Sequence, residues 1–406
     1  MLLNCQPKAI RIKARLKTLC CWWCFWVIVV TPISTSGSPL LPPNPEEARI
    51  AKLAIEVPQL DRAVSRFCAP FIDELISPLW TNDEAQVQSL GIAVWRAARA
   101  LVQSGLLDDR LLYWCRLTLA SRLSELLAQS SMAQTDAEAL LKFFDQASRG
   151  LHSSYWNQSN ALQVLITGFD PFSLDKHIDQ SNPSGLAALT LDGKILSQGE
   201  QKLEIKSAMF PVRYRDFDQG LLETWLTPLL ENRSVDLMLT VSMGRDGFDL
   251  ERFPGKRRSA AAPDNLGVFA GGSGSIPIIP LLVDQALSGP EFVEFRLPAE
   301  SMLGAEGLFD VRDNREVATL ERGVFRAKDL VDLAGQTAVR GSGGGYLSNE
   351  ISYRSIRLTN ALGVSIPIGH IHTPRMEGYN PETLQAILDQ VQQLILLAAS
   401  PSPSVR

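Results

Sequence analysis

Cysteine and histidine are both scarce in this chain of 406 residues. Four of the six cysteines lie within the first 24 residues, which leaves Cys68 and Cys115 in the body, in no metal-binding or catalytic spacing. In an exported protein these two are expected either to form one disulfide or to stay as buried thiols, and the sequence leaves both alternatives open. With only four histidines present, a motif that contains two of them is informative.

Several motifs of common enzyme classes are also missing. The chain has no Gly-x-Ser-x-Gly elbow, no Walker loop and no Gly-x-Gly-x-x-Gly that follows a strand. These absences argue against an ordinary α/β hydrolase, a nucleotide-binding protein and a dinucleotide-binding enzyme. We therefore expect no cofactor.

Acidic residues are absent from the first 36 residues, which contain five lysines and arginines. The whole chain has a formal net charge of −5, so the rest has −10, and nucleic acid is not an expected partner. An apolar run at 19–30 follows the cations, as in a signal peptide, and is shorter than the roughly 18 residues that span a bilayer. We expect residues 1–37 to be a signal peptide, or alternatively a membrane anchor, and the protein to be exported, periplasmic if bacterial. Contact with a membrane is expected only through this segment.

The next segment, residues 38–160, is predicted to be a helical domain that begins with a Pro-rich linker. Between about 45 and 150 the apolar residues recur at helical spacing, as at Val87, Leu90 and Val94. Thr135 and Glu138 have the spacing of a capping box. The polar residues show no convergent catalytic set, so this domain is expected to pack on its neighbour.

Residues 161–400 are predicted to form an α/β domain. Short β-prone runs at 164–167, 207–212, 235–241, 293–297 and 364–368 are separated by helical stretches, among them 221–230 and 381–399. The last helix has Asn380 as its N-cap and Pro381 at its first position. Such alternation is typical of a three-layer α/β/α domain with a twisted, mostly parallel sheet and a site at the strand ends.

Four loop segments of this domain contain reactive side chains. The first, Gly168–Phe172 with the downstream Asn182, suggests an apolar slot with one hydrogen-bonding wall. The second contains Glu251, a candidate site carboxylate, although an exposed glutamate paired with an arginine would look the same. The third is the glycine-rich run 341–345, which passes into an expected helix start at Ser348, where backbone N–H groups can stabilise an oxyanion.

The fourth loop segment contains His370 and His372, expected just after the strand 364–368. His-x-His can bind a metal, but no third ligand is suggested nearby, so no metal site is predicted. A hydroxyl nucleophile needs a base and the base needs an orienting group, and Ser348, His372 and Glu251 make such a set.

In these four segments the chain resembles the pyroglutamyl peptidase I family of cysteine peptidases. The family's T-G-F-[DE]-P-F and N-P-S motifs match 167–172 and 182–184, and its G-R, E-R and P-D-N block matches 244–245, 251–252 and 263–265. Its A-G-T-F-V-C-N-H-x-x-Y segment aligns with 343–353, and its F-I-H-x-P with 370–374. The resemblance covers about 163–399, which leaves the first 160 or so residues outside it.

The resemblance implies roles for individual residues. Glu251 and His372 fall on the family's catalytic glutamate and histidine, and Phe169, Phe172 and Asn182 on residues that line the pyroglutamate pocket. Tyr346 and Leu347 are expected beside the substrate as well.

The departures from the family are as informative. Ser348 replaces the nucleophilic cysteine, and Glu350 replaces the histidine that follows it. Val241 and Ala261 replace a glutamine and an arginine, which is expected to weaken recognition of the substrate and of developing negative charge. Extra residues between Pro298 and Gly341 are expected to remodel the entrance.

These observations predict an exported hydrolase that removes an N-terminal pyroglutamyl or related acyl group from peptides through a Ser/His/Glu triad. The expected partner is thus a peptide or small acyl substrate. Two alternatives stay open, which are a binding protein that has lost catalysis and an envelope scaffold that acts through the helical domain. A homo-oligomer is also left open.

Overall fold

The computed structural model describes residues 44–152, 156 and 160–400. The predicted signal peptide or anchor, residues 1–37, therefore lies outside the described residues. Among the described helices, none is long and apolar enough to span a bilayer. The described residues fall within one compact unit by their contacts.

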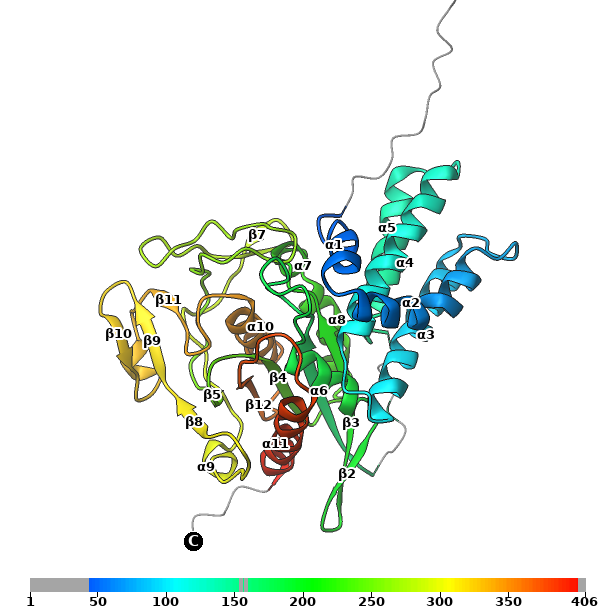
Figure 1. Ribbon diagram of the computed structural model, residues 1–406. Coiled ribbons are helices and arrows are strands. Elements are labelled where there is room, and N and C mark those ends of the chain that lie inside the picture. The colour runs from blue at the N-terminus through cyan, green and yellow to red at the C-terminus, as the bar shows by residue number, and fades with distance from the viewer. Residues whose placement is uncertain (1–43, 153–155, 157–159, 401–406) are drawn as a thin grey trace, which may run out of the picture. The chain divides into compact units, whose positions relative to one another are not determined.

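The first part of this unit, up to Gly150, is helical as predicted (Figure 1). Its helices are α1 (Arg49–Glu56), α2 (Pro58–Leu75), α3 (Glu84–Gln103), α4 (Arg110–Gln129) and α5 (Gln134–Ala147). Proline at the first position starts α2, and the Asp83 side chain caps α3 by accepting a hydrogen bond from the Gln86 N–H. The predicted capping box is wrong, because α5 begins before Thr135 and the side chain of Glu138 instead accepts a hydrogen bond from Gln134.

A seven-stranded, mostly parallel sheet forms the centre of the second part, which confirms the predicted α/β class (Figure 1). The strand order is β2-β3-β1-β4-β12-β5-β8. The β1, β3, β4 and β12 strands run parallel, and β5 and β8 are parallel to each other but β5 is antiparallel to β12. The strands are β1 (Leu162–Phe169), β2 (Ile195–Gln198), β3 (Gln201–Phe210), β4 (Leu237–Met243), β5 (Phe248–Glu251), β8 (Val311–Asn314) and β12 (Ile368–Thr373).

Two strand predictions need correction. Residues 293–297 form no strand, and their apolar side chains Val293, Phe295 and Leu297 are buried in the core from an extended connection. The run predicted at 364–368 is displaced, because the strand begins only after Pro367, which has no N–H to give to a ladder. His370 and His372 consequently lie on β12 itself, and not in a loop after it.

Helices cover both faces of the sheet. One face is covered by α6 (Pro183–Leu191) and α11 (Pro381–Ala399), and α3 of the helical part packs on α6. The other face is covered by α8 (Leu221–Glu231) and α10 (Leu347–Ala361), next to the short α7 (Tyr214–Asp218). The start of α11 is as predicted, since Asn380 accepts a hydrogen bond from the Thr383 N–H and Pro381 follows it.

The extra residues between Pro298 and Gly341 add structure at the β8 edge of the sheet. They form α9 (Ala299–Met302), β8 and a separate three-stranded sheet of β9 (Glu316–Thr319), β10 (Gly323–Arg326) and β11 (Ala338–Arg340), with a 3-10 turn at Val331–Leu333. A small hairpin of β6 (Leu281–Leu282) and β7 (Gln285–Ala286) precedes them. The insertion therefore extends the edge strand β5 with β8.

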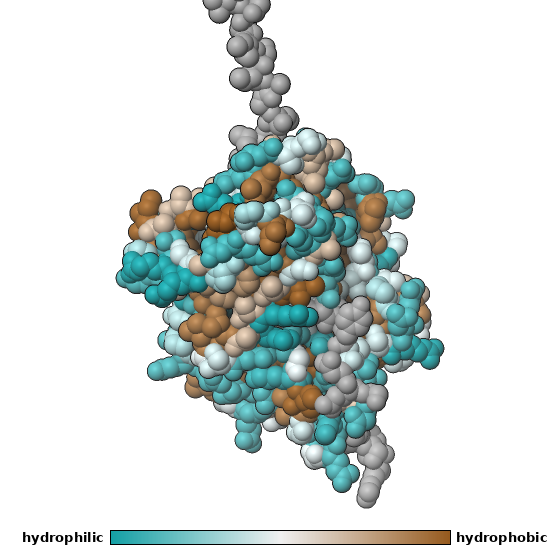
Figure 2. Space-filling view, turned by 90° about the vertical axis from the view of Figure 1, so that its right-hand side faces the viewer, coloured by the Kyte–Doolittle hydropathy of each residue, from teal (hydrophilic) through white to brown (hydrophobic). Residues whose placement is uncertain are grey.

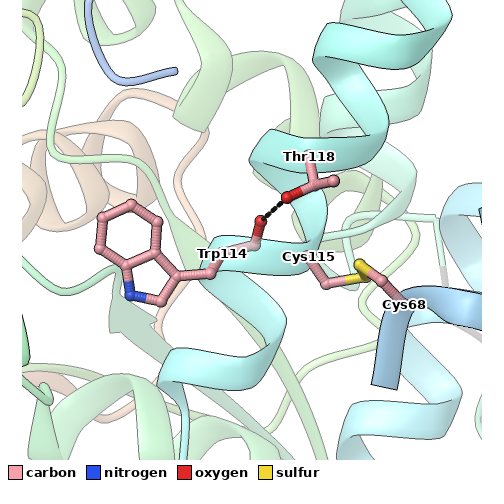
Figure 3. Close-up of a disulfide and its surroundings, with 4 residues drawn as sticks. All are labelled: Cys68, Trp114, Cys115 and Thr118. Atoms are coloured by element: carbon pink, nitrogen blue, oxygen red, sulfur yellow. Dashed lines mark hydrogen bonds between the residues drawn. A yellow bond between two sulfur atoms is a disulfide. The ribbon is translucent and has the colours of Figure 1, made fainter. Parts of the chain in front are cut away.

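A disulfide joins α2 to α4 through Cys68 and Cys115, which decides between the two alternatives for these cysteines (Figure 3). Both are fully buried, and the bond closes a separation of 47 residues. A cross-link of that length typically stabilises a folded protein by about 2–4 kcal/mol, since it restricts the unfolded chain. On the face shown in Figure 2, hydrophilic and hydrophobic residues are interspersed, as is usual for a protein surface.

Candidate active site

The predicted acid and base lie in contact. The Nδ1 atom of His372 on β12 is 2.6 Å from Oε1 of Glu251 at the end of β5. Glu251 is fully buried and His372 nearly so. Burial raises the pKa of Glu251, and the neighbouring His372 opposes part of this rise by favouring the carboxylate. Such a contact fixes the ring orientation and leaves Nε2 as the nitrogen for proton transfer.

The end of β4 approaches the base very closely. A Cβ atom placed on Gly244 would lie 2.5 Å from Cβ of His372, so only glycine fits here. This close packing gives a physical reason for the Gly-Arg pair that follows β4.

His370 is separate from this pair. Its Nδ1 atom is 2.8 Å from Oγ1 of Thr240 and its Nε2 atom is 2.8 Å from Oγ of Ser242. It is fully buried, and burial lowers its pKa well below the usual value. With both ring nitrogens bound and no charge, His370 supports the floor of the site and does not compete with His372 for the role of base.

The glycine-rich loop positions Ser348 in the first turn of α10. Gly344 has a φ of 92°, which favours glycine. The side chain of Asn349, in the same turn of α10 as Ser348, accepts a hydrogen bond from the Gly255 N–H and donates one to the Gly255 carbonyl. The helix begins one residue earlier than predicted, at Leu347. The N–H groups of Leu347, Ser348 and Asn349 have no partner inside the helix, so this turn can hold an oxyanion.

Ser348 is not hydrogen-bonded to the base. Its hydroxyl donates to the carbonyl of Gly343 at 3.2 Å, and among the described residues no hydrogen bond connects it to His372. Catalytic hydrogen bonds are often long or misaligned before a substrate is bound, so this geometry is compatible with a nucleophile at rest.

A small slot opens beside Ser348 where β1 and β4 end. All the side chains predicted to contact the substrate line it, and three residues that were not predicted join them. The lining is Phe169, Phe172, Asn182, Val212, Ser242, Met243, Tyr346, Leu347 and Ser348. Phe169 stacks on the ring of Phe217, which holds it in place from behind.

Asn182 is already hydrogen-bonded within the protein. Its Oδ1 caps α6 by accepting hydrogen bonds from the N–H and the hydroxyl of Ser184. Its Nδ2 donates to the carbonyl of Asp170 at 2.9 Å. The side chain therefore supports the slot wall, whatever contact it makes with a substrate.

Asn314 is a site residue that sequence reasoning missed. It lies on β8, and its Nδ2 donates to Oε2 of Glu251 at 2.9 Å and to the carbonyl of Ser342 at 3.0 Å. One amide thus connects the acid to the loop that leads to Ser348. Because Asn314 comes from the inserted segment, no motif of the resemblance pointed to it.

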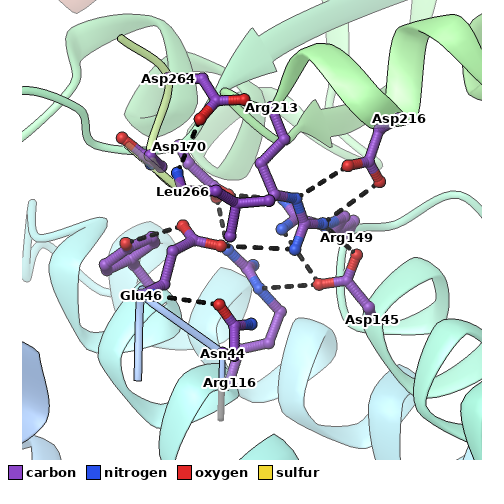
Figure 4. Close-up of polar contacts among 12 residues, drawn as sticks. Asn44, Glu46, Arg116, Asp145, Arg149, Asp170, Arg213, Asp216, Asp264 and Leu266 are labelled. Atoms are coloured by element: carbon purple, nitrogen blue, oxygen red, sulfur yellow. Dashed lines mark hydrogen bonds and ion pairs between the residues drawn. The ribbon is translucent and has the colours of Figure 1, made fainter. Parts of the chain in front are cut away.

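Buried charges from the helical part hold Asp170, the residue after Phe169 of the slot (Figure 4). Asp170, which follows Phe169, is fully buried, with its two oxygens 2.5 Å from Arg116 Nη2 and 2.7 Å from Arg149 Nη1. Arg149 also pairs with Asp145 on α5 at 2.9 Å. Sequence reasoning missed this cluster. Arg116 lies among buried apolar residues of α4, and a cation in such a position requires a buried partner, so it was a signal that could have indicated the cluster.

Asp109, which precedes α4, holds the same wall at a second point. Its carboxylate accepts hydrogen bonds from the Ser181 hydroxyl and from the Asn182 N–H, the latter at 2.9 Å. Burial raises the pKa of Asp109 to about 7, against the hydrogen bonds that favour its charged form. The helical part is therefore in direct contact with the wall of the slot.

The substituted family positions have structural explanations. Glu350 lies in a buried ion cluster, with Arg258 at 2.6 Å and Arg354 at 2.8 Å. Val241 packs in the core and is not among the residues that line the slot. Ala261 is exposed. Among the described residues, no group of three or more His, Cys, Asp or Glu is placed to hold a metal.

Comparisons with known proteins identify a matching family model and an uncharacterised relative. A family model described as the C-terminal domain of PA0049 matches residues 163–312 and 326–377. An uncharacterised protein of Pseudomonas aeruginosa, PA0049, is 28% identical over 386 aligned residues, which cover 71% of this chain and 69% of that protein.

Solved structures of pyrrolidone carboxyl peptidase from Pyrococcus furiosus are also similar. A mutant form has a TM-score of 0.40 and 22% identity, and another structure of the enzyme has 0.39 and 24%. Each covers 58% of this chain and 98% of its own.

Proposed function

We propose that this protein is an exported serine hydrolase that removes an N-terminal pyroglutamyl or related acyl group from peptides. The observation that supports this most is the buried Glu251–His372 pair, because His372 is the ladder partner of Ser242, and Ser242 lines the same slot as Ser348. The motif resemblance to pyroglutamyl peptidase I supports the same reaction class, with a hydroxyl in place of the thiol.

The proposed mechanism uses three side chains and one helix end. Ser348 attacks the acyl carbonyl while His372 accepts its proton, and Glu251 stabilises the imidazolium that forms. The free N–H groups at the start of α10 stabilise the oxyanion. His372 then protonates the leaving amine. In the second step water attacks the acyl–Ser348 ester while His372 accepts its proton, and His372 returns this proton to the Ser348 oxygen as the acid leaves.

A serine nucleophile depends more on the base, His372, than a cysteine nucleophile would. A thiol is partly ionised near neutral pH, whereas a serine hydroxyl is not, so the proton must leave during the attack. Because the Ser348 hydroxyl rests on the Gly343 carbonyl, a rotation toward His372 must precede the reaction.

Export is part of the proposal. The Cys68–Cys115 disulfide supports it, since structural disulfides persist mainly in oxidising compartments. The composition of the first 37 residues supports it independently.

Labelling with a fluorophosphonate tests the nucleophile. We expect the probe to modify Ser348, and expect Ser348→Ala to lose both the label and the hydrolysis of acyl p-nitroanilides. Ser352→Ala is a matched control one turn further along α10, because Ser352 is buried and its hydroxyl has no hydrogen-bond partner in the part of the chain that the structure describes. Labelling or hydrolysis that persists in Ser348→Ala would exclude this residue as the nucleophile.

A second candidate is a binding protein without catalysis. It is favoured by the absence of a Ser348–His372 hydrogen bond among the described residues. Measurable affinity for acyl peptides by calorimetry, with no turnover and no labelling, would support it over the hydrolase.

A further inference from the structure

The two oxygens of the Glu251 carboxylate have different partners. Asn314 on β8 is the register partner of Glu251 in the parallel β5–β8 pair, so the two side chains stand side by side on the sheet. The Nδ2 atom of Asn314 donates to Oε2 of Glu251 at 2.9 Å, whereas Oε1 is the oxygen that contacts His372. A carboxylate held at one oxygen has the direction of its other oxygen fixed as well.

The Asn314 amide is itself held in one orientation by three hydrogen bonds. Besides the bond to Glu251, its Nδ2 donates to the Ser342 carbonyl at 3.0 Å, and its Oδ1 accepts from the Glu316 N–H at 3.1 Å. A backbone N–H can only donate, so it keeps Oδ1 on its own side and Nδ2 toward Glu251. Turning the amide over would lose all three bonds.

Glu251 needs donors to act on His372 as a carboxylate. It is fully buried, and burial raises its pKa, while the contacts with His372 and Ser342 lower it. A neutral acid cannot stabilise a protonated imidazole, so the orienting role requires the charged form. The amide donor on Oε2 favours this form, since a hydrogen bond to a carboxylate stabilises its charge.

The same amide also contacts the loop that leads to Ser348. Ser342, whose carbonyl accepts from Asn314, is paired with Phe253 by two hydrogen bonds: its N–H donates to the Phe253 carbonyl at 3.0 Å, and its Oγ accepts from the Phe253 N–H at 2.9 Å. One side chain of the inserted segment therefore connects the acid of the site to the start of the glycine-rich loop.

We infer that Asn314 is a positioning residue, which fixes Glu251 so that its Oε1 faces His372 and holds the glycine-rich loop against the same pair. The inference rests on the proposed function in taking His372 as the base. A serine nucleophile depends on a correctly oriented base, and β8 of the inserted segment supplies a contact that keeps this orientation.

A spectroscopic measurement tests the inference without turnover. The chain has four histidines, so isotope labelling of histidine nitrogen gives few NMR signals, and the Nδ1–H proton of His372 is identified by its absence in His372→Ala. We expect a protected low-field signal in the wild type, because the hydrogen bond to Glu251 is short and buried. Asn314→Leu keeps nearly the same volume but removes the donor, and the signal should broaden or disappear.

A second variant, Asn314→Ala, keeps the test open if the leucine variant does not fold, which urea unfolding shows. Its effect on the signal should be in the same direction and smaller, because Asn314 is only partly buried and water can take the place of its amide.

Thr319→Val is the matched control. Thr319 is buried on β9 in the same inserted segment, and its hydroxyl bonds, to Gln336 and to the Arg322 N–H, stay within the insertion. This variant should keep both the signal and the activity. In Asn314→Leu, kcat for an acyl p-nitroanilide should fall by about 10²-fold with KM unchanged.

Several results would overturn the inference. They are a signal that is missing from the wild type, one that is retained in both Asn314 variants, one that is lost equally in Thr319→Val, and a KM that rises in Asn314→Leu while kcat stays the same.

Turnover by the wild-type chain separates this inference from the proposed function. A wild type that cleaves no acyl substrate, but whose His372 signal depends on Asn314, contradicts the hydrolase and leaves the positioning role intact. Equal kcat values in the wild type and in Asn314→Leu contradict the positioning role and leave the hydrolase intact.

Discussion

The two sides of the slot are held in place by different kinds of interaction. The acyl side is the wall of the slot that contains Asn182 and adjoins Asp170. There, buried ions that come from the helical part hold Asp170 and the loop around Asn182. On the base side, one neutral amide from the inserted strand β8 holds Glu251. Neither support is part of the motifs that resemble a known family, so two separate additions to the fold meet at one site.

This difference predicts that variants on the two sides fail in different ways. Removing a partner from a buried ion cluster leaves an uncompensated charge, and the cost appears as lost stability. Changing the acid on the base side leaves the packing nearly intact, and the cost appears as lost catalysis.

Glu251→Gln should have the largest effect, on catalysis. Both neighbours of the carboxylate, His372 Nδ1–H and Asn314 Nδ2, are donors, and glutamine offers only one acceptor oxygen. When the amide nitrogen of the glutamine faces the ring, it donates to Nδ1 of His372 and favours the tautomer of His372 that has its proton on Nε2. In that tautomer Nε2 cannot accept a proton from Ser348. We expect kcat for an acyl p-nitroanilide to fall by about 10⁴-fold.

Asp249→Asn is the control for this prediction. It removes a carboxylate from the same strand, where Asp249 pairs with Arg312 at 2.7 Å and not with His372. A loss of only a few-fold is expected for this variant. If the two variants lose activity equally, the effect is one of general charge, and the orienting role of Glu251 is wrong.

Asp170→Leu should have the next largest effect, on stability. The substitution keeps the approximate volume but leaves two fully buried arginines without this carboxylate. We expect the free energy of unfolding in urea to fall by about 3–5 kcal/mol. Glu125→Leu, which breaks the exposed Arg122–Glu125 pair, should cost no more than about 1 kcal/mol. Similar losses in the two variants would contradict the role given to the buried cluster.

The side chains that line the slot and the Glu251–His372 contact could be predicted because they lie in short contiguous motifs. Phe169 and Glu251 end strands and Ser348 lies in the first turn of a helix, and each is next to a loop that local patterns of glycine and proline mark. The position of the two histidines on β12 was harder to predict, since it depends on where Pro367 allows the hydrogen-bonded strand to begin.

The supports of the site could not be predicted from local patterns. Asn314 lies 63 residues from Glu251, and Arg116 lies 54 residues from Asp170. An asparagine in a strand and an arginine in a helix have many ordinary roles, and only the tertiary fold decides their partners. Arg116 at an apolar position indicates that a partner exists but not which one it is.

Asp109→Asn should have the smallest effect, and it distinguishes the two sides by pH. Burial raises the pKa of Asp109 from the usual 3.8 to about 7, so the folded protein binds a proton here that the unfolded chain has released. Stability from this group is therefore present at acidic pH and is lost as the pH rises toward 7, by about 2–3 kcal/mol between pH 5 and 7.

Asparagine removes the titration and retains the contacts, because its oxygen can accept from the Asn182 N–H while its nitrogen donates to the Ser181 hydroxyl. Urea unfolding at several pH values should show a flatter profile for Asp109→Asn than for the wild type, with the two converging toward acidic pH. Identical profiles would mean that Asp109 is ionised in the folded protein throughout this range. Its hydrogen bonds to Ser181 and Asn182 would then outweigh the effect of burial on its pKa.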